Sequence, residues 1–277
     1  MEAPKRVLCI MDISVVGRAG LSAVAPVLAG CGVQACMLPT ALFSAHTGGF
    51  GQPETQDVAA FAQRALRHYK QHGIAFDAVY TGYLCSPAQF ALAEAAFAQY
   101  PDAMRVVDPA MADNGTLYSG LPEDVAARMA HLCEKATLIT PNATEAALLA
   151  GQPPGQADAP ALLAALSGPG RSVVVTSVPA AAGGQQIAGC GPAGANVFAV
   201  PVHTVPQHFP GAGDAFTAAV VGEVLAGHSL EGACRMAAHF VGQAAAATHT
   251  AGADARCGLW LEPFLPLLAA PLPPEQF

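Results

Sequence analysis

Short apolar segments alternate with longer stretches of helical periodicity along most of the chain, and this alternation limits the fold more than any other feature. The apolar segments are mostly unbroken, as is typical of parallel strands that are covered on both faces of a sheet. Strands are expected over Arg6–Met11, Val33–Leu38, Ala78–Thr81, Met104–Val107, Thr137–Ile139 and Ser172–Thr176. Helices are expected over Ala19–Ala29, Thr55–His72, Pro87–Gln99, Pro122–Lys135, Asn142–Ala150 and Ala159–Leu166. The pattern predicts an α/β fold with a mostly parallel central sheet and helices on both faces.

The pattern changes in the last third of the chain. Two short strands that pair antiparallel at one edge of the sheet, followed by two helices, are expected over Gln186–Ala188, Asn196–Val200, Gly213–Ala226 and Leu230–Thr248. Neither an internal repeat nor a long linker divides the chain. We therefore interpret residues 1–271 as a single domain and residues 272–277 as a disordered tail.

Composition narrows the classes of partner. Apolar residues make up 53% of the chain and charged residues 12%, which excludes an intrinsically disordered protein. The net charge of -8 repels phosphate backbones and anionic membranes, so we expect no nucleic-acid partner and no membrane partner. The first residues lack the pattern of a signal peptide, and the 8 cysteines contain no C-x-x-C pair. These features predict a cytoplasmic protein with buried, reduced thiols.

Polar residues and glycines gather where the predicted strands end. They are Asp12, Ser14, Gly17 and Gly20; Ser44, His46, Thr47, Gly48 and Gly49; Gly82 and Tyr83; Asp108 and Asp113; Asn142 and Glu145; Thr176 and Ser177. In an open parallel sheet, ligands bind beyond the carboxyl ends of the strands. We therefore expect these residues to meet in one ligand site.

The sharpest local motif is Gly211-Ala212-Gly213-Asp214, at the mouth of a predicted helix. Small residues there expose successive backbone N–H groups, which form an anion hole together with the positive end of the helix dipole. Asp214 has two interpretations. It is either a carboxylate that stabilises the first turn of the helix, or a general base beside a transferring phosphoryl group.

Two common nucleotide-binding classes do not fit. The chain has no Walker motif, so it is not a P-loop enzyme. The segment Gly17-Arg18-Ala19-Gly20 misses the glycine spacing of a dinucleotide fingerprint, which argues against a dehydrogenase.

Several motifs resemble those of the ribokinase-like superfamily. Gly211-Ala212-Gly213-Asp214 resembles its C-terminal signature, and Asn142-Ala143-Thr144-Glu145 its N-x-x-E element. The segment from Val107 to Gly115 resembles the V-D-P-V-M-G-D segment of its vitamin-kinase branch. The segment from Phe43 to Gly49, followed by Thr81-Gly82-Tyr83, resembles pyridoxal kinases, most of all the bacterial pyridoxamine/pyridoxal type. The likeness runs from Arg6 to about Thr248.

The resemblance implies a ribokinase-like fold and an ATP- and Mg²⁺-dependent kinase for the 5′-hydroxymethyl group of a B6 vitamer. Asp214 would be the catalytic base, and Gly211, Ala212 and Gly213 the anion hole. Thr176 and Ser177 would touch the nucleotide phosphates. The resemblance also implies a homodimer, and it leaves a need for a monovalent cation such as K⁺ open.

The metal site is likewise inferred from the resemblance. Asp108 and Glu145 would hold Mg²⁺, and Asn142 would help to organise the metal and its waters. Other interpretations remain open for these residues. Asn142 and Glu145 have the spacing of a helix capping box, and Asp108 could simply end a strand before proline.

The substrate residues implied by the resemblance are Asp12, His46, Thr47 and Tyr83. Asp12 stands where many pyridoxal kinases have Ser facing the pyridine nitrogen, and a carboxylate there would favour a protonated ring. It could instead bind a hydroxyl group, as in the sugar kinases of the superfamily. His46 and Thr47 would lie beside the 4′ and 3′ substituents, and Tyr83 near the ring and its hydroxymethyl arm.

Other parts of the chain suggest a lid and alternative functions. The polar segment from Asp113 to Tyr118 is expected to cover the site. His203 and His208 would either flank the adenine or simply be exposed. The alternatives to a B6 kinase are a hydroxymethylpyrimidine kinase of thiamine salvage and a non-catalytic relative that binds a vitamer or a nucleotide.

Overall fold

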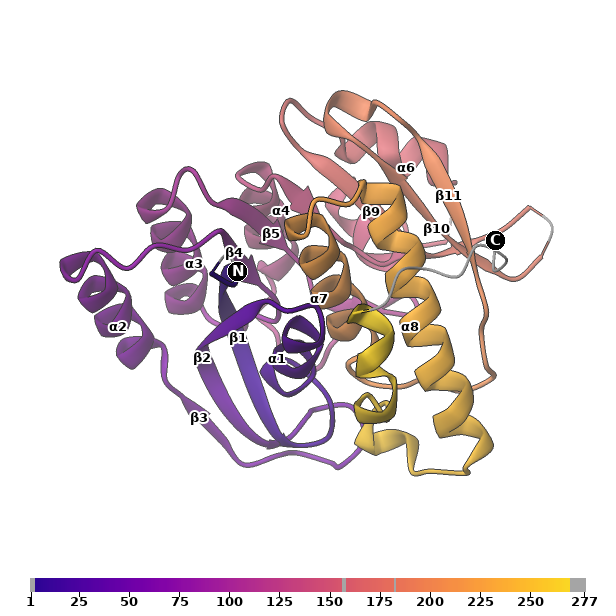
Figure 1. The fold of residues 1–277 in the computed structure, drawn as a ribbon, viewed down its shortest axis with the longest axis horizontal. Coiled ribbons are helices and arrows are strands. Elements are labelled where there is room, and N and C mark those ends of the chain that lie inside the picture. The colour runs from indigo at the N-terminus through magenta and orange to yellow at the C-terminus, as the bar shows by residue number, and fades with distance from the viewer. Residues whose placement is uncertain (1–2, 156–157, 182, 270–277) are drawn as a thin grey trace.

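A mixed sheet runs through the computed structural model, which describes residues 3–155, 158–181 and 183–269 (Figure 1). Within these residues the sheet has nine strands in the order β11-β10-β9-β8-β5-β4-β1-β2-β3. The parallel strands are β1 (Arg6–Val16), β2 (Gln34–Ala45), β4 (Ala78–Thr81), β5 (Met104–Val107), β8 (Leu138–Ile139) and β9 (Ser172–Pro179). The antiparallel strands at the two edges are β3 (Thr55–Asp57), β10 (Gln185–Cys190) and β11 (Phe198–Val202). The predicted α/β class is confirmed.

Helices cover both faces of the sheet because alternate residues of its strands point to opposite sides. In β1, Val7, Cys9 and Met11 belong to one core, and Leu8 and Ile10 to the other. The first core is closed by α1 (Leu21–Gly30), α7 (Ala212–Leu225), α8 (Leu230–Thr250) and the 3₁₀ segment η3 (Glu262–Ala269) (Figure 1). The second is closed by α2 (Ala59–Gln71), α3 (Pro87–Gln99), α4 (Val125–Glu134), α5 (Ala143–Leu149) and α6 (Ala159–Leu166).

The first two strands run further than predicted. β1 and β2 stay paired up to Val16 and Ala45, so Asp12, Ser14 and Ser44 lie within strands and not after them. The overhang of β2 offers a free edge, and Thr55–Asp57 pairs with it antiparallel. The prediction of a helix from Thr55 was therefore wrong at its start, because α2 begins at Ala59. Tertiary pairing thus decided the structure of an exposed polar segment that has no apolar pattern of its own.

The predicted lid forms a short β-hairpin. Its strands are β6 (Ala112–Asp113) and β7 (Thr116–Leu117). Asn114 and Gly115 make the turn, with φ angles of 49° and 80°. Asn-Gly is the dipeptide that such two-residue turns favour, because both positions need positive φ. The sequence carried this signal, which our prediction of an unstructured segment missed.

Two other features bear on the predictions. Of the helices in the described ranges, none has the length and apolar character that crossing a bilayer requires. All 8 cysteines are free thiols, and Cys9, Cys133, Cys190 and Cys234 are buried. Cys257 is exposed, unlike the buried thiols predicted. The predicted tail, residues 272–277, lies outside the described residues.

Candidate active site

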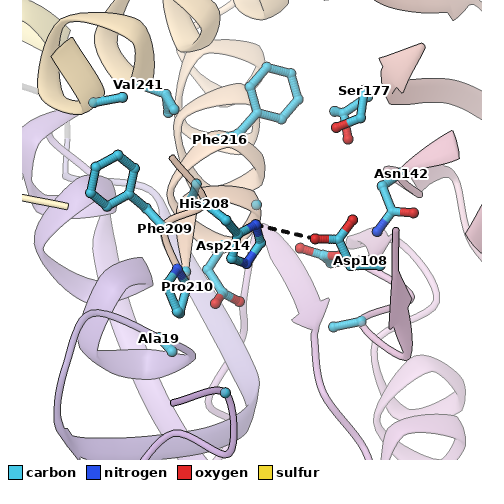
Figure 2. A pocket seen from close by; sticks show the side chains of 18 of the residues that line it. Ala19, Asp108, Asn142, Ser177, His208, Phe209, Pro210, Asp214, Phe216 and Val241 are labelled. Atoms are coloured by element: carbon cyan, nitrogen blue, oxygen red, sulfur yellow. Dashed lines mark ion pairs between the residues drawn. The ribbon is translucent and has the colours of Figure 1, made fainter. Parts of the chain in front are cut away.

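A cavity of about 730 Å³ opens beyond the carboxyl ends of the parallel strands (Figure 2). Its lining includes every residue predicted for the site: Asp12, His46, Thr47, Tyr83, Asp108, Asn142, Glu145, Thr176, Ser177, Gly211, Ala212, Gly213 and Asp214. It also includes Asp113, Tyr118, His203 and His208. The strand-end argument thus predicted where the cavity lies, although the residues come from the whole length of the chain.

The N-terminus of α7 is held by close backbone contact. Gly211 has a φ of 80° and caps the helix. A Cβ atom there would lie 1.5 Å from the carbonyl oxygen of Arg18, so only glycine fits. The amide of Ala212 donates to the carbonyl of Phe209. The anion hole therefore rests on the amides of Gly213 and Asp214, which belong to the first turn and have no acceptor within the helix.

Asp214 is half-buried and is held from the other side by the N-terminal loop. Its Oδ2 accepts a hydrogen bond from the amide of Gly20, at 2.9 Å. Burial raises the pKa of Asp214 from its ordinary 3.8 to about 6, against the lowering effect of the Gly20 bond. Such a carboxylate is ionised at neutral pH and close to the proton affinity that a general base needs. Its bond to a distant loop favours the base over a carboxylate that merely stabilises the first turn.

Gly20 has no role in the sequence predictions, yet it separates two carboxylates. A Cβ atom on it would lie 2.5 Å from the carbonyl oxygen of Asp12 and 2.9 Å from both carboxylate oxygens of that residue. Its φ of 58° is one that side chains rarely adopt. Gly20 therefore lets Asp12 and Asp214 approach one another. No local motif marks this role, because Gly20 and Asp214 are 194 residues apart.

The cavity gathers carboxylates without neutralising them. Burial, and then the charge of Asp214, raise the pKa of Asp12 to about 7 and that of Asp108 to about 8. Burial, and then the charge of Asp108, raise the pKa of Glu145 well above its ordinary value. Buried carboxylates shifted in this direction lack a cation. Hard carboxylate oxygens are what Mg²⁺ binds, so these residues fit the predicted metal.

Asn142 and Glu145 form the capping box of α5, which confirms that interpretation. Glu145 Oε2 accepts from the Asn142 amide, and its Oε1 accepts from the amides of Met111 and Ala112. The Asn142 side chain in turn donates to the Ala112 carbonyl at 2.7 Å. The pair therefore ties the segment after Asp108 to the start of α5. Any role of Glu145 at a metal must be shared with this structural one.

Thr176 and Ser177 lie in a bulge of β9 and not at its end. Pairing with β10 shifts between Gln186 and Ala188, opposite these two residues. Ser177 has a φ of 58°, which is uncommon for a residue with a side chain. Bulges re-aim side chains next to active sites, and both of these residues line the cavity. The predicted residues thus reach the cavity by a distortion that the apolar pattern did not indicate.

The vitamer end of the cavity holds His46 by both ring nitrogens. Nδ1 accepts from the Gly48 amide at 3.0 Å, so Nε2 carries the proton and donates to the Arg256 carbonyl at 2.5 Å. Neither nitrogen is left to bind a substituent of a substrate ring, and His46 contributes the rest of its imidazole ring to the lining. Arg256 belongs to the 3₁₀ segment η2 (Ala255–Cys257), a contact that the sequence did not predict.

Tyr83 and Thr47 complete this end. The ring of Tyr83 packs edge-on against Phe43, with centroids 6.1 Å apart, and both side chains line the cavity. Thr47 lies next to His46 and is partly exposed. These neighbours suit a flat aromatic substrate, because an aromatic ring packs well against the edge or face of another.

Comparisons with known proteins extend these observations. A family model described as phosphomethylpyrimidine kinase matches residues 15–257. A pyridoxine/pyridoxal/pyridoxamine kinase from Bordetella pertussis is 32% identical over 271 residues, which cover 90% of this chain and 91% of the relative.

Solved structures agree in fold over nearly the whole chain. A putative phosphomethylpyrimidine kinase from Bacteroides thetaiotaomicron, in an orthorhombic crystal form with pyridoxal, is 33% identical, with a TM-score of 0.92. The match covers 98% of this chain and 97% of that one. Pyridoxal kinase from Lactobacillus plantarum is 32% identical, with a TM-score of 0.88 over 96% of this chain and 97% of its own. The chain therefore belongs to the phosphomethylpyrimidine kinase family and, as its resemblance to pyridoxal kinases predicted, has their ribokinase-like fold.

Proposed function

We propose that this enzyme phosphorylates the 5′-hydroxymethyl group of a B6 vitamer (pyridoxal, pyridoxine or pyridoxamine) with ATP and Mg²⁺, as a step of vitamer salvage. The position of Asp214 carries the proposal: it lies beside the first-turn amides of α7 and is held by Gly20. A base next to an anion hole suits attack by an alcohol on a phosphoryl group. The names of the Bordetella and Lactobacillus relatives, and the pyridoxal in the Bacteroides crystal form, support the substrate.

The reaction would be a direct transfer. Asp214 takes the proton of the 5′-hydroxyl as its oxygen attacks the γ-phosphorus of ATP, and the bond from that phosphorus to the bridging oxygen breaks to release ADP. The amides of Gly213 and Asp214 donate to the oxygens of the phosphoryl group in transit. Asp214 then loses the proton to solvent. No phosphoenzyme is formed.

The vitamer ring would lie among Asp12, His46, Thr47 and Tyr83, which line one end of the cavity. Asp12 would face the pyridine nitrogen. Burial and the charge of Asp214 raise the pKa of Asp12 to about 7, so a proton shared with a ring nitrogen of similar basicity would make a strong hydrogen bond.

The nucleotide would occupy the rest of the cavity. Ile187, Val202, Phe216 and Val241 make one part of its lining apolar, which suits an adenine ring (Figure 2). Thr176 and Ser177 would contact the phosphates. Mg²⁺, when bound, would neutralise part of the triphosphate charge, with Asp108 holding it and Glu145 and Asn142 holding its waters. The homodimer, the monovalent cation and the cytoplasmic location stay predictions.

A hydroxymethylpyrimidine kinase is the second candidate, favoured by the description of the family model. The two functions are separated by steady-state turnover of the purified enzyme with ATP and Mg²⁺, on pyridoxal and on hydroxymethylpyrimidine. We expect kcat/KM for pyridoxal to exceed that for the pyrimidine at least ~10-fold, because one missing polar contact in a site costs at least this much. A preference for the pyrimidine would reverse the assignment. Turnover of neither substrate would indicate the non-catalytic relative.

A further inference from the structure

The cavity proposed to hold a triphosphate lacks the usual side chains for binding one. None of the described residues that line it is a lysine or an arginine. Asp12, Asp108, Asp113, Glu145 and Asp214 all line it, so its side chains would repel phosphates. The α7 N-terminus supplies only about half a positive charge. A further cation is therefore needed on the protein side of the phosphates.

The basic residues of the flanking segments are engaged elsewhere. Arg18 pairs with Glu262, and Arg256 pairs with Asp254 at 2.7 Å. Of the histidines that line the cavity, His46 has both ring nitrogens bonded to the backbone. His203 directly follows β11, next to the apolar part of the lining. These observations leave His208 on the carboxylate side.

His208 is well placed for this role. It comes three residues before Gly211, and its neighbour Phe209 is only 4% exposed, which anchors the backbone beside it. Its own side chain is 64% exposed and reaches across the cavity to the hairpin, where Nδ1 lies 3.3 Å from Asp113 Oδ2 (Figure 2). In Figure 2 the imidazole lies above Asp214, on the side of Asp108. Its backbone is thus fixed, while its ring is free to turn.

We propose that His208 is a nucleotide-binding residue, which donates from its imidazolium to the phosphates of ATP and is held across the cavity by Asp113 until the nucleotide binds. This inference rests on the proposed function. A protonated imidazole paired with a carboxylate retains a second N–H donor, and a phosphate oxygen is a stronger anionic partner than an exposed carboxylate. His208 therefore selects for nucleotides that carry phosphates, while the apolar lining selects only for the base.

Binding of two probes separates a charge contact from a structural role. Calorimetry would measure a non-hydrolysable ATP analogue with Mg²⁺, and adenosine, on the wild type, H208Q, H208K and the control H72Q. His72 is an exposed histidine at the end of α2, outside the cavity lining. We expect H208Q to weaken binding of the analogue about 10-fold and that of adenosine less than about 2-fold, and H208K to stay within about 3-fold of the wild type. H72Q should match the wild type with both probes.

Steady-state kinetics gives a second readout. In H208Q, the KM for ATP should rise about 10-fold, while the KM for pyridoxal and kcat stay within about 3-fold. Unchanged binding of the analogue by H208Q, equal losses for adenosine and the analogue, or an H208K variant as weak as H208Q would overturn the proposal. A wild type that binds neither probe would instead contradict the proposed function, so the two failures are distinguishable.

Discussion

The two ends of the cavity are built in different ways. At the catalytic end, around Asp214, contacts come from backbone atoms of distant segments: the Gly20 amide and the Arg18 carbonyl. At the vitamer end, around His46, they come from a loop whose Gly48 and Gly49 are exposed. Backbone contacts without room for a Cβ atom tolerate little change, whereas an exposed loop can vary. The catalytic end therefore sets the reaction, and the vitamer end can adapt to different substrates.

The largest expected effect is at Asp214. We expect Asp214→Asn to lower kcat at least ~10²-fold, with vitamer binding largely kept, because the amide cannot take the hydroxyl proton. Kinetics and vitamer titration would measure this. Asp158→Asn is the matched control, since Asp158 caps α6 through the Ala161 amide, outside the cavity lining. It should cost about 1 kcal/mol of stability or less and leave kcat unchanged. Full activity of the Asp214 variant would remove this residue from its role.

The next effect contrasts one glycine from each end. Gly20→Ala would place a Cβ atom against Asp12 and loosen the bond to Asp214, so we expect kcat/KM to fall about 10-fold or more. Gly48→Ala would place its Cβ atom 3.4 Å from His46 Nδ1, an ordinary contact, and should change kcat/KM less than about 3-fold.

The pH profile tells positioning from general damage in the Gly20 variant. The Gly20 amide lowers the pKa of Asp214, so weakening this bond should move the acidic limb of the kcat profile to higher pH. A loss of activity with an unmoved limb would mean that Gly20 only supports the fold. Equal losses in the two glycine variants would remove the contrast between the ends.

The smallest effect concerns Asp12, which lies where the two ends meet. Burial raises the pKa of Asp12 from 3.8 to about 7, so the folded protein keeps a proton that the unfolded chain releases near pH 4. The stability that this proton contributes is complete below about pH 4 and is lost as the pH rises through about 7. The Tm of the wild type should therefore fall between pH 5 and pH 8, in buffer with EDTA, by a few degrees more than that of Asp12→Asn. Identical slopes in calorimetry would show that Asp12 is not protonated in the folded protein.

Much of the fold follows from local patterns. Apolar strands and helical periodicity predicted the order of the parallel strands' elements and the helix that starts at the anion hole. The missed details depend on pairing between segments. Thr55–Asp57 is a strand because β2 offers it an edge, and the bulge at Ser177 arises where β9 and β10 lose register. Neither feature has an apolar pattern, so neither could be read from its own residues.

The candidate site divides in the same manner. Its residues could be chosen from the sequence, because polar groups and glycines at strand ends are a local signal, and all of the predicted residues line the cavity. Their partners could not. The bond from His46 to Arg256 spans 210 residues, and the bond from Gly20 to Asp214 spans 194.

The sequence by itself determined the α/β class, the edge of the sheet where ligands bind and the chemical groups that gather there, since these depend on periodicity and on residue type. The tertiary structure decided which hydrogen bonds those groups make, how far burial moves the pKa values of Asp12 and Asp214, and that His208 reaches Asp113. The physical reason is that hydrogen bonds and desolvation depend on distances between atoms that only folding brings together.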